Sequence, residues 1–263
     1  MKIALLQMDI VLGDVEANKA KALSMMRKAV EKKAELLVLP ELWSTGYRLD
    51  RIHELAEPAD GPTLQMLNNF AKDNQVEIVT GSVAELRDGK VYNSAFAINA
   101  KGKTIAHYSK IHLIGLMQED TYIASGDHQS KFDLSFGKAG LIICYDLRFT
   151  ELPRTLALQG CQTLFVPAEW PASRGRHWVI LNTARAIENQ MFVIAVNRVG
   201  KDDKNTFFGH SLVINPWGEV LAEGSENEEE VIVVDVDFAS VAEIRQRMPV
   251  FKDRKPQYYG MDD

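Results

Sequence analysis

The sequence predicts an α/β protein in which strands and helices alternate along one chain. Short apolar runs rich in valine, isoleucine and leucine, typical of buried strands, are separated by segments with apolar residues at helical spacing. The chain has 263 residues, of which 46% are hydrophobic and 25% charged, ordinary proportions for a globular protein. No low-complexity linker or change in composition divides it. We therefore expect a single domain over residues 1–263, with a polar C-terminal tail from about residue 248.

The first half of the chain opens with two buried strands on either side of a helix. The apolar runs Ile3–Met8 and Leu36–Leu39 predict the strands, and the segment from about Asn18 to Lys33 predicts the amphipathic helix. A glycine-containing turn at 101–103 indicates a hairpin. The remaining elements expected here are a helix Thr63–Asp73, a strand Glu77–Val83, and the hairpin strands Val91–Asn99 and Thr104–Tyr108.

The second half again alternates strands with helices, and Pro216, Trp217 and Gly218 mark a turn between two hairpin strands. The residues from about 174 to 189 predict its longest helix. The expected elements are strand Ala139–Cys144, helix Thr150–Gln159, strand Thr163–Val166, helix Arg174–Asn189, strand Met191–Val196, hairpin segments Ser211–Asn215 and Glu219–Ala222, strand Val231–Val236 and helix Ala239–Arg247.

Two segments about half the chain apart resemble each other. Leu37–Trp43 and Leu164–Trp170 each consist of an apolar run that ends at a proline and is followed by a glutamate and a tryptophan. Two stacked sheets with helices outside would place such segments symmetrically, although similar strand ends also arise by chance.

Composition and charge disfavour several classes of protein. The 36 acidic residues outnumber the 30 lysines and arginines, and a net charge of -6 argues against a nucleic-acid-binding domain. The first apolar run, Ile3–Leu6, is shorter than the roughly 7–15 residues of a signal peptide. No run approaches the roughly 18 apolar residues of a membrane span. The two cysteines, Cys144 and Cys161, are expected to stay reduced, and we expect a cytoplasmic protein without nucleic-acid or membrane partners.

Cys144 is the first candidate for chemistry. It closes an apolar run and precedes a predicted helix, and a strand-to-helix turn can present a nucleophile beside backbone N–H groups. A cysteine at a strand end is also a common small core residue. The six histidines lie in no recognised cysteine–histidine signature, and no spacing of histidines or cysteines indicates a metal site.

Glu41 and Lys110 are the candidate partners of this thiol. Glu41 follows the strand Leu36–Leu39, and Lys110 follows the strand Thr104–Tyr108, so each charged group stands at the end of an apolar element. Taken singly, each is compatible with a solvated surface charge. Together with Cys144 they supply a proton acceptor, an oxyanion partner and a nucleophile for acyl transfer.

Six segments around and beyond these three positions form a recognisable set. They are Leu39–Trp43, Tyr108–Leu113, Ile143–Phe149, Ala184–Asn189, Gly209–Ser211 and Asn215–Glu219. In this order they resemble the nitrilase superfamily of carbon–nitrogen hydrolases. The resemblance implies a four-layer α-β-β-α sandwich and a Glu–Lys–Cys triad at Glu41, Lys110 and Cys144, with Glu119 as an assisting glutamate. It also implies a homodimer or higher homo-oligomer.

The resemblance and the residue chemistry imply a mechanism without a metal or an organic cofactor. Glu41 would take the thiol proton while Cys144 attacks an amide carbonyl. The ammonium of Lys110 and the backbone N–H of Tyr145 would hold the oxyanion. Glu41 would then protonate the leaving ammonia and activate water to hydrolyse the thioester.

The residues after the cysteine indicate the kind of substrate. Cys144-Tyr145-Asp146 followed by Arg148 is similar to the amidase branch that includes ω-amidases, which implies a small ω-amide such as 2-oxoglutaramate or succinamate. We expect Arg174 and Arg176 to grip the distal carboxylate of the substrate. Trp170 is expected in the same binding region.

Three other interpretations stay open. The sequence departs from better-known ω-amidases at 169–171 and 173–176, and Glu169 could favour a cationic substrate, which would make the protein an N-carbamoyl-amine amidohydrolase. A non-catalytic binding protein on the same scaffold is the second alternative. The third is a redox-sensing thiol protein with Cys161 as the resolving cysteine, but Cys161 is expected to be buried at a helix end.

Overall fold

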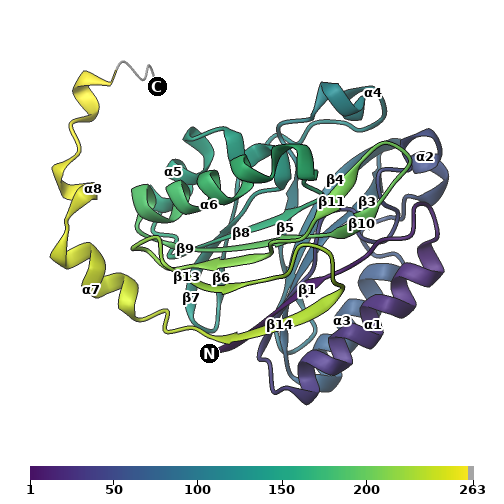
Figure 1. Cartoon of the computed structure of the whole chain (residues 1–263), viewed down its shortest axis with the longest axis horizontal. Coiled ribbons are helices and arrows are strands. Elements are labelled where there is room, and N and C mark those ends of the chain that lie inside the picture. Colours follow the sequence, from purple (N-terminus) through teal and green to yellow (C-terminus); the bar gives the residue numbers. More distant parts are fainter. Residues whose placement is uncertain (260–263) are drawn as a thin grey trace.

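The computed structural model describes residues 1–259 and contains two six-stranded sheets, shown in Figure 1. In spatial order the first sheet consists of β14 (Glu230–Asp235), β1 (Lys2–Gln7), β2 (Leu36–Val38), β3 (Glu77–Arg87), β4 (Lys90–Ile98) and β5 (Thr104–Ser109). The second consists of β13 (Val220–Glu223), β12 (Leu212–Ile214), β9 (Phe192–Asn197), β8 (Thr163–Ala168), β7 (Gly137–Leu141) and β6 (Ser130–Leu134). A separate two-stranded ribbon consists of β10 (Val199–Lys201) and β11 (Thr206–Phe208).

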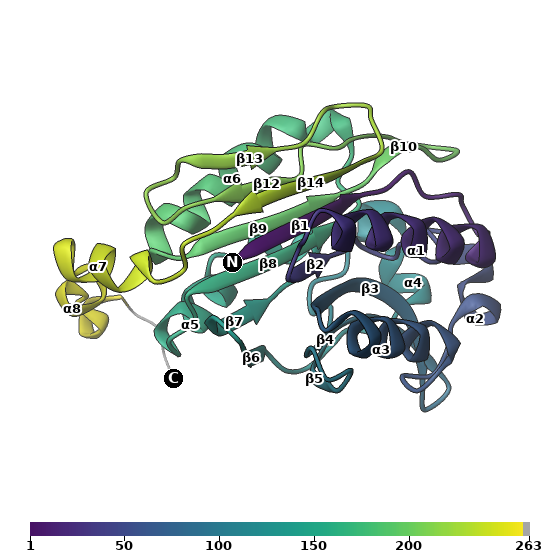
Figure 2. The ribbon, with the colours of Figure 1, turned by 90° about the horizontal axis from the view of Figure 1, so that it is seen from below.

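The two sheets pack face to face, and helices cover their outer faces (Figure 2). Helices α1 (Val15–Glu31) and α3 (Pro62–Asn74) lie on the first sheet, and α5 (Glu151–Leu158) and α6 (Gly175–Asn189) lie on the second. Successive strand residues point to opposite faces. Ile3 of β1 accordingly belongs to the core between the sheets, whereas Ala4 packs in the core beneath α1 and α3. The prediction of a four-layer α-β-β-α sandwich is confirmed.

The resemblance between Leu37–Trp43 and Leu164–Trp170 has a structural counterpart. Strand β2 pairs in parallel with β1 and β3, and β8 pairs in parallel with β7 and β9. Each sheet therefore has a parallel centre with antiparallel strands outside it. The two similar segments begin in β2 and β8, each the middle one of the three parallel strands of its sheet. Their positions are therefore equivalent, as expected for two stacked sheets with helices outside.

Short helices and turns connect or extend this frame. In Figures 1 and 2, α7 and α8 lie at one end of the molecule, beyond the sandwich. The expected polar tail from about residue 248 contains α8 and one 3₁₀ turn, and its residues 260–263 lie outside the described ones. The short helices are α2 (Ile52–Leu55), α4 (Glu119–Tyr122), α7 (Ser240–Arg247) and α8 (Val250–Asp253). The 3₁₀ turns are η1 (Leu49–Arg51), η2 (Gly115–Met117), η3 (Cys144–Arg148), η4 (Ala172–Arg174) and η5 (Pro256–Tyr258).

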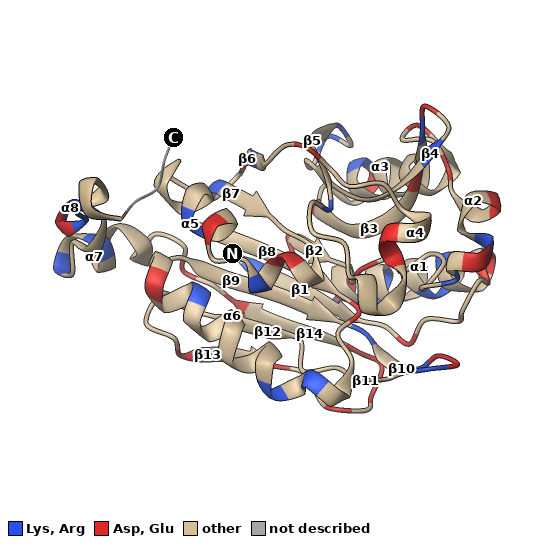
Figure 3. Cartoon of the chain, turned by 90° about the horizontal axis from the view of Figure 1, so that it is seen from above, with Lys and Arg blue, Asp and Glu red and all other residues tan. Residues whose placement is uncertain are grey.

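Charged residues of both signs lie mainly on helices, turns and loops, while the strands of the sandwich are largely uncharged (Figure 3). This distribution keeps charge away from the apolar layers, so a charged side chain buried at a strand end is unusual. Within residues 1–259 no helix is long and apolar enough to cross a membrane.

Candidate active site

The predicted triad residues converge from both sheets. Glu41 follows β2, Lys110 follows β5, and Cys144 begins η3 after β7. Glu41 and Lys110 are fully buried, and Cys144 is 7% exposed. The Lys110 Nζ lies 2.8 Å from Glu41 Oε1, and both charged groups lie close enough to the Cys144 thiol to change its pKa. The fold therefore assembles the three groups into one buried cluster.

Glu41 is held as an ionised carboxylate. Its Oε1 accepts hydrogen bonds from Lys110 Nζ, Tyr47 OH and Asn93 Nδ2, each at 2.8 Å. Its Oε2 accepts one from the backbone N–H of Glu169, also at 2.8 Å. Burial raises the pKa of Glu41, but the Lys110 ammonium and these donors outweigh burial and hold the pKa below its ordinary value. A base that is ionised at neutral pH can accept the thiol proton.

Cys144 lies in a strained turn rather than in a strand. The expected strand Ala139–Cys144 is too long, because β7 ends at Leu141 and Cys144 has a left-handed φ of +45°. For a residue with a Cβ this conformation costs roughly 1–2 kcal/mol. The Asp146 carboxylate stabilises the turn, since its Oδ2 accepts hydrogen bonds from the Ile143 N–H at 2.9 Å and from the Tyr108 hydroxyl at 2.7 Å.

The Cys144 thiol keeps its proton until a base removes it. Burial, and next the negative charge of Glu41, raise the pKa of Cys144 well above its ordinary value, while Lys110 lowers it. Thiolate is the reactive form of cysteine. The geometry therefore favours proton transfer to Glu41 that accompanies nucleophilic attack over a preformed thiolate.

Lys110 is enclosed by carboxylates. Its Nζ lies 2.9 Å from both oxygens of Glu119, in addition to its contact with Glu41. Burial lowers the pKa of Lys110, but Glu119 and Glu41 more than reverse this and raise it. Glu119 is itself fixed, because its Oε2 also accepts a hydrogen bond from the Ile114 N–H at 2.9 Å. Lys110 is consequently a permanent, immobile positive charge beside the thiol.

Sequence reasoning assigned no role in the site to the side chains of Tyr47, Asn93 and Asp146, which complete this network. The Asn93 NH₂ group donates to both Glu41 and Glu119, and the Tyr47 hydroxyl lies 2.8 Å from Glu41 Oε1, its nearer acceptor, and 3.3 Å from Glu119 Oε1. A polar Asn93 near the start of an apolar strand was a usable signal, and Asp146 lies inside the motif after Cys144. Nothing in the sequence around Tyr47 indicates that its hydroxyl reaches the site.

A small pocket next to Cys144 contains most of the expected substrate-binding residues. Tyr145, Trp170 and Arg174 line it, together with Arg148, which the sequence identified only as part of the motif after Cys144 and not as a substrate-binding residue. The Arg148 guanidinium lies 4.6 Å from the centre of the Trp170 ring. Burial, and next the charge of Arg174, lower the pKa of Arg148. The free volume is about 10 Å³, roughly one water molecule, so side chains must move when a substrate enters.

Arg176 does not share this position. It lies exposed in the first turn of α6 and is not among the residues that line the pocket. Helix α6 begins directly after the 3₁₀ turn η4. Its buried face includes Trp178, whereas Arg176 lies on its solvent-exposed side. The expectation that Arg176 joins Arg174 at the pocket is therefore corrected, and Arg148 takes its place there.

Glu169 pairs with Arg198 instead of with a pocket arginine. Its Oε2 lies 3.0 Å from Arg198 Nη1, and both side chains are fully buried. Arg198 also donates to the Ile10 carbonyl at 2.8 Å, which holds it behind Glu169. The Glu169 side chain is thus bound inside the protein by Arg198, and Arg148 and Arg174 are cationic residues that line the pocket.

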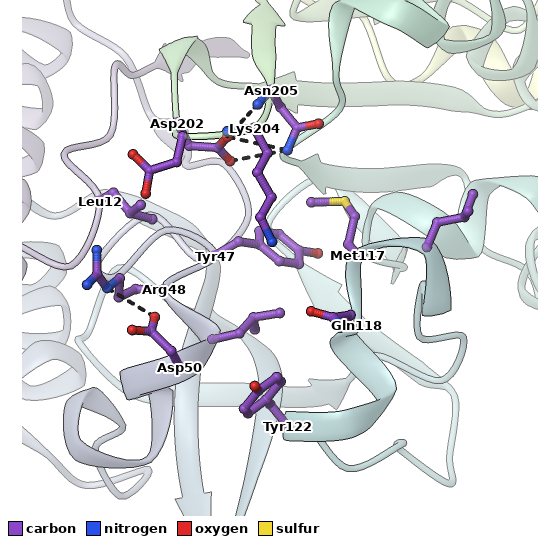
Figure 4. A pocket seen from close by; sticks show the side chains of 13 residues that line it. Leu12, Tyr47, Arg48, Asp50, Met117, Gln118, Tyr122, Asp202, Lys204 and Asn205 are labelled. Carbon is purple, nitrogen blue, oxygen red and sulfur yellow. Dashed lines mark hydrogen bonds and ion pairs between the residues drawn. The ribbon is translucent and has the colours of Figure 1, made fainter.

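A larger cavity of about 670 Å³ adjoins the site (Figure 4). Tyr47 and Met117 line both this cavity and the small pocket. In Figure 4 the Lys204 side chain extends toward the Tyr47 ring. The cavity is formed by loops at 47–50, 116–122 and 202–205, with both charge signs present. Tyr47 therefore lies between this cavity and Glu41, to which its hydroxyl donates.

No metal site accompanies these groups among residues 1–259. No cluster of three or more histidine, cysteine, aspartate or glutamate side chains there is arranged to hold a metal ion. Cys144 and Cys161 are both free thiols, and both are buried.

Comparison with known proteins identifies the family. Residues 2–246 match the carbon–nitrogen hydrolase family. The chain is 43% identical over 257 residues to a 2-oxoglutaramate amidase of Bacillus subtilis, covering 98% of each chain. It is 36% identical over 273 residues to the omega-amidase NIT2 of Homo sapiens, covering 99% of this chain and 97% of the relative.

A solved structure agrees with this match. Saccharomyces cerevisiae Nit3, a member of branch 10 of the nitrilase superfamily, superposes with a TM-score of 0.90 and 30% identity. The superposition covers 97% of this chain and 96% of Nit3. The chain belongs to the carbon–nitrogen hydrolase family of the nitrilase superfamily and is a hydrolase that acts on carbon–nitrogen bonds in amides.

Proposed function

We propose that this protein hydrolyses a small ω-amide of a dicarboxylic or keto acid, of the 2-oxoglutaramate or succinamate type, with Cys144 as nucleophile. The observation that carries the proposal is the buried cluster in which Glu41 contacts Lys110 and faces the Cys144 thiol. Relatives named 2-oxoglutaramate amidase and omega-amidase support the substrate class.

The first half-reaction forms a thioester and releases ammonia. Glu41 accepts the proton of Cys144 while the sulfur attacks the amide carbonyl. The negative oxygen of the tetrahedral intermediate is stabilised by the Lys110 ammonium and by the N–H of Tyr145. As the intermediate collapses, the C–N bond breaks, and Glu41 returns the proton to the departing nitrogen.

The second half-reaction regenerates the enzyme. Glu41, again a carboxylate, removes a proton from water as the water oxygen attacks the thioester carbonyl. The C–S bond then breaks, and the proton on Glu41 passes to the Cys144 sulfur. Glu119 does not transfer a proton in this scheme, because its contacts with Lys110 suit it to fixing the ammonium.

The charges around the pocket support an anionic substrate. Arg148 and Arg174 line the pocket, and a guanidinium can bind a carboxylate through two parallel hydrogen bonds. Burying an unpaired carboxylate is costly, so these cations favour substrates whose distal end is an acid. A cationic N-carbamoyl amine would need an unpaired acid, whereas Glu169 is already paired with Arg198.

A panel of amides with ammonia detection tests the proposal. We expect kcat/KM for succinamate and 2-oxoglutaramate to exceed that for neutral amides of equal length. A wild-type enzyme that turns over a cationic N-carbamoyl amine faster than every acidic ω-amide would contradict the assignment, as would Cys144-independent activity.

We also propose a cytoplasmic homodimer or higher homo-oligomer. Two buried free thiols suit a reducing compartment. The outer face of α6 leaves Ile180 and Ile187 each 50% exposed, and the nearby Trp217 is 40% exposed, which is an apolar surface suited to a second copy. Light scattering during size-exclusion chromatography measures the assembly, and a concentration-independent monomer would contradict it.

A further inference from the structure

Glu169 has a buried carboxylate oxygen without a partner. Its Oε2 binds Arg198, but within residues 1–259 its buried Oε1 has no hydrogen-bond partner. Glu169 lines the same pocket as Cys144, Arg148 and Arg174. A buried polar atom left unpaired costs roughly 1–3 kcal/mol, so this oxygen is suited to a group that arrives with the substrate.

Burial and the neighbouring carboxylates favour the neutral, protonated form of Glu169, against the opposing charge of Arg198. Glu41 faces it from the end of β2, Arg198 from the end of β9, and Asp202 from the loop between β10 and β11. Burial raises the pKa of Glu169 to about 8, with Arg198 lowering it and Glu41 raising it. Within the buried network, the ionised forms of Glu41 and Glu119 already balance the cations Lys110 and Arg198. An ionised Glu169 would add a further negative charge there, which Arg148 and Arg174 on the pocket side would have to offset.

Protonation defines what the unpaired oxygen can do. Since Oε2 accepts the Arg198 N–H, the proton resides on Oε1, which gives the pocket-lining Glu169 side chain an O–H donor. A bound anion beside Arg148 and Arg174 disfavours ionisation of Glu169 further. The matching group on a ligand is therefore an uncharged acceptor oxygen next to an acidic end.

We propose that Glu169 is a specificity-determining residue whose protonated carboxyl donates a hydrogen bond to the 2-oxo oxygen of the substrate. The inference rests on the proposed function, which places the distal carboxylate at Arg148 and Arg174, next to Glu169. A substrate with a methylene at carbon 2 leaves the Glu169 O–H without an acceptor. A substrate with a 2-ammonium group places further N–H donors against the Glu169 O–H. Glu169 thus selects 2-oxo ω-amides.

The test compares 2-oxoglutaramate with glutaramate, which has a methylene in place of the ketone, by ammonia release. Glu169→Gln keeps the shape and supplies an N–H donor at the same place while its oxygen still accepts from Arg198. Glu169→Leu removes the donor. Glu77→Gln is the matched control, because Glu77 is another buried carboxyl but binds Ser135 outside the pocket.

For wild type and Glu77→Gln we expect kcat/KM to favour 2-oxoglutaramate over glutaramate by about 10–100-fold, the usual discrimination from one buried hydrogen bond. Glu169→Leu should lose this ratio, and Glu169→Gln should keep most of it. In the wild type the ratio should fall as the pH rises through about 8, since the proton is lost from Glu169, whereas in Glu169→Gln it should stay constant.

Circular dichroism and thermal unfolding of each variant report whether the preparation is folded, and the ratio of the two kcat/KM values does not depend on the folded fraction. A wild type without the preference, a Glu169→Leu enzyme that retains it, or a Glu169→Gln enzyme that loses it as Leu does would each overturn the inference while leaving ω-amide hydrolysis intact. A wild type that hydrolyses neither compound would refute the proposed function, on which the inference rests.

Discussion

Glu41→Gln is the sharpest single perturbation of the proposed mechanism, because it removes the proton acceptor and keeps the shape of the side chain. The carboxylate of Glu41 accepts four hydrogen bonds, three at Oε1 and one at Oε2. A glutamine can accept the three with its own oxygen only if its NH₂ group faces the Glu169 N–H. In the variant the glutamine NH₂ group therefore faces the N–H of Glu169, so that two donors meet. The other three hydrogen bonds remain.

The expected magnitudes follow from this geometry. One buried hydrogen bond becomes a mismatch, which costs roughly 1–3 kcal/mol of unfolding free energy. In a protein of this size the melting temperature should fall by roughly 2–12 °C. Activity should fall much further, by about 10²–10⁴-fold, the usual contribution of a general base. The raised pKa of Cys144 leaves little thiolate to compensate for the missing base.

The pH dependence of stability provides an independent check. The pKa of Glu41 in the folded protein lies below that of a free glutamate, roughly 4.3, so Glu41 stabilises the fold above that pH and this contribution is lost as pH falls. The stability difference between wild type and Glu41→Gln should accordingly narrow below pH of about 4, as measured by urea unfolding. In the activity assay, Glu77→Gln is the comparison variant, because it also replaces a buried carboxyl but lies outside the pocket, and we expect it to keep glutaramate turnover. A Glu41→Gln enzyme with near-wild-type acylation would refute the role of Glu41 as base.

Three further predictions address the other groups. Rapid acid quench with substrate should trap an acyl adduct on the Cys144 peptide, and an adduct on the buried Cys161 would show that the nucleophile is misassigned. Lys110→Met keeps the aliphatic stem and should slow acylation by about 10²–10³-fold, as for a lost oxyanion donor; unchanged single-turnover acylation would exclude this role. Arg148→Ala and Arg174→Ala should raise KM for acidic ω-amides while sparing neutral amides, whereas Arg176→Ala, at an exposed position, should change neither; equal losses for both substrate classes would argue against carboxylate binding.

The regular elements of the fold were predictable because their apolar residues follow the helical or strand period. The boundary at Cys144 was not, since the apolar run continues to Ile143 while the left-handed Cys144 already belongs to η3. Strand β6 was missed although Ser130–Leu134 alternates buried and exposed residues, because it is short and carries two charges. A single peripheral strand gives a weaker signal than the long apolar runs at the centre of each sheet.

In the site, the strand-end positions of Glu41, Lys110 and Cys144 were visible in the sequence, but their environment was not. The sequence does not distinguish Arg174 from Arg176, because both are arginines in the same polar segment. The chain passes from η4 into α6 between them, which places Arg174 at the pocket and leaves Arg176 exposed. Likewise the partner of Glu169 could not be read from nearby positions, because Arg198 comes from the end of a neighbouring strand, 29 residues away.

The two similar strand ends show how environment divides one motif into two chemical roles. Glu41 and Glu169 leave equivalent middle strands of their sheets and meet at the Glu169 N–H. Both are buried, and each has a cation partner, Lys110 for one and Arg198 for the other. Glu41 in addition accepts a hydrogen bond from Asn93, and the hydrogen bonds from the Glu169 backbone and Tyr47 lower its pKa. Glu169 instead has an oxygen without a partner among residues 1–259 and a pKa of about 8. Because a nearby negative charge disfavours a second one, the ionisation of Glu41 helps to keep Glu169 protonated, which pairs a base with a hydrogen-bond donor at neutral pH.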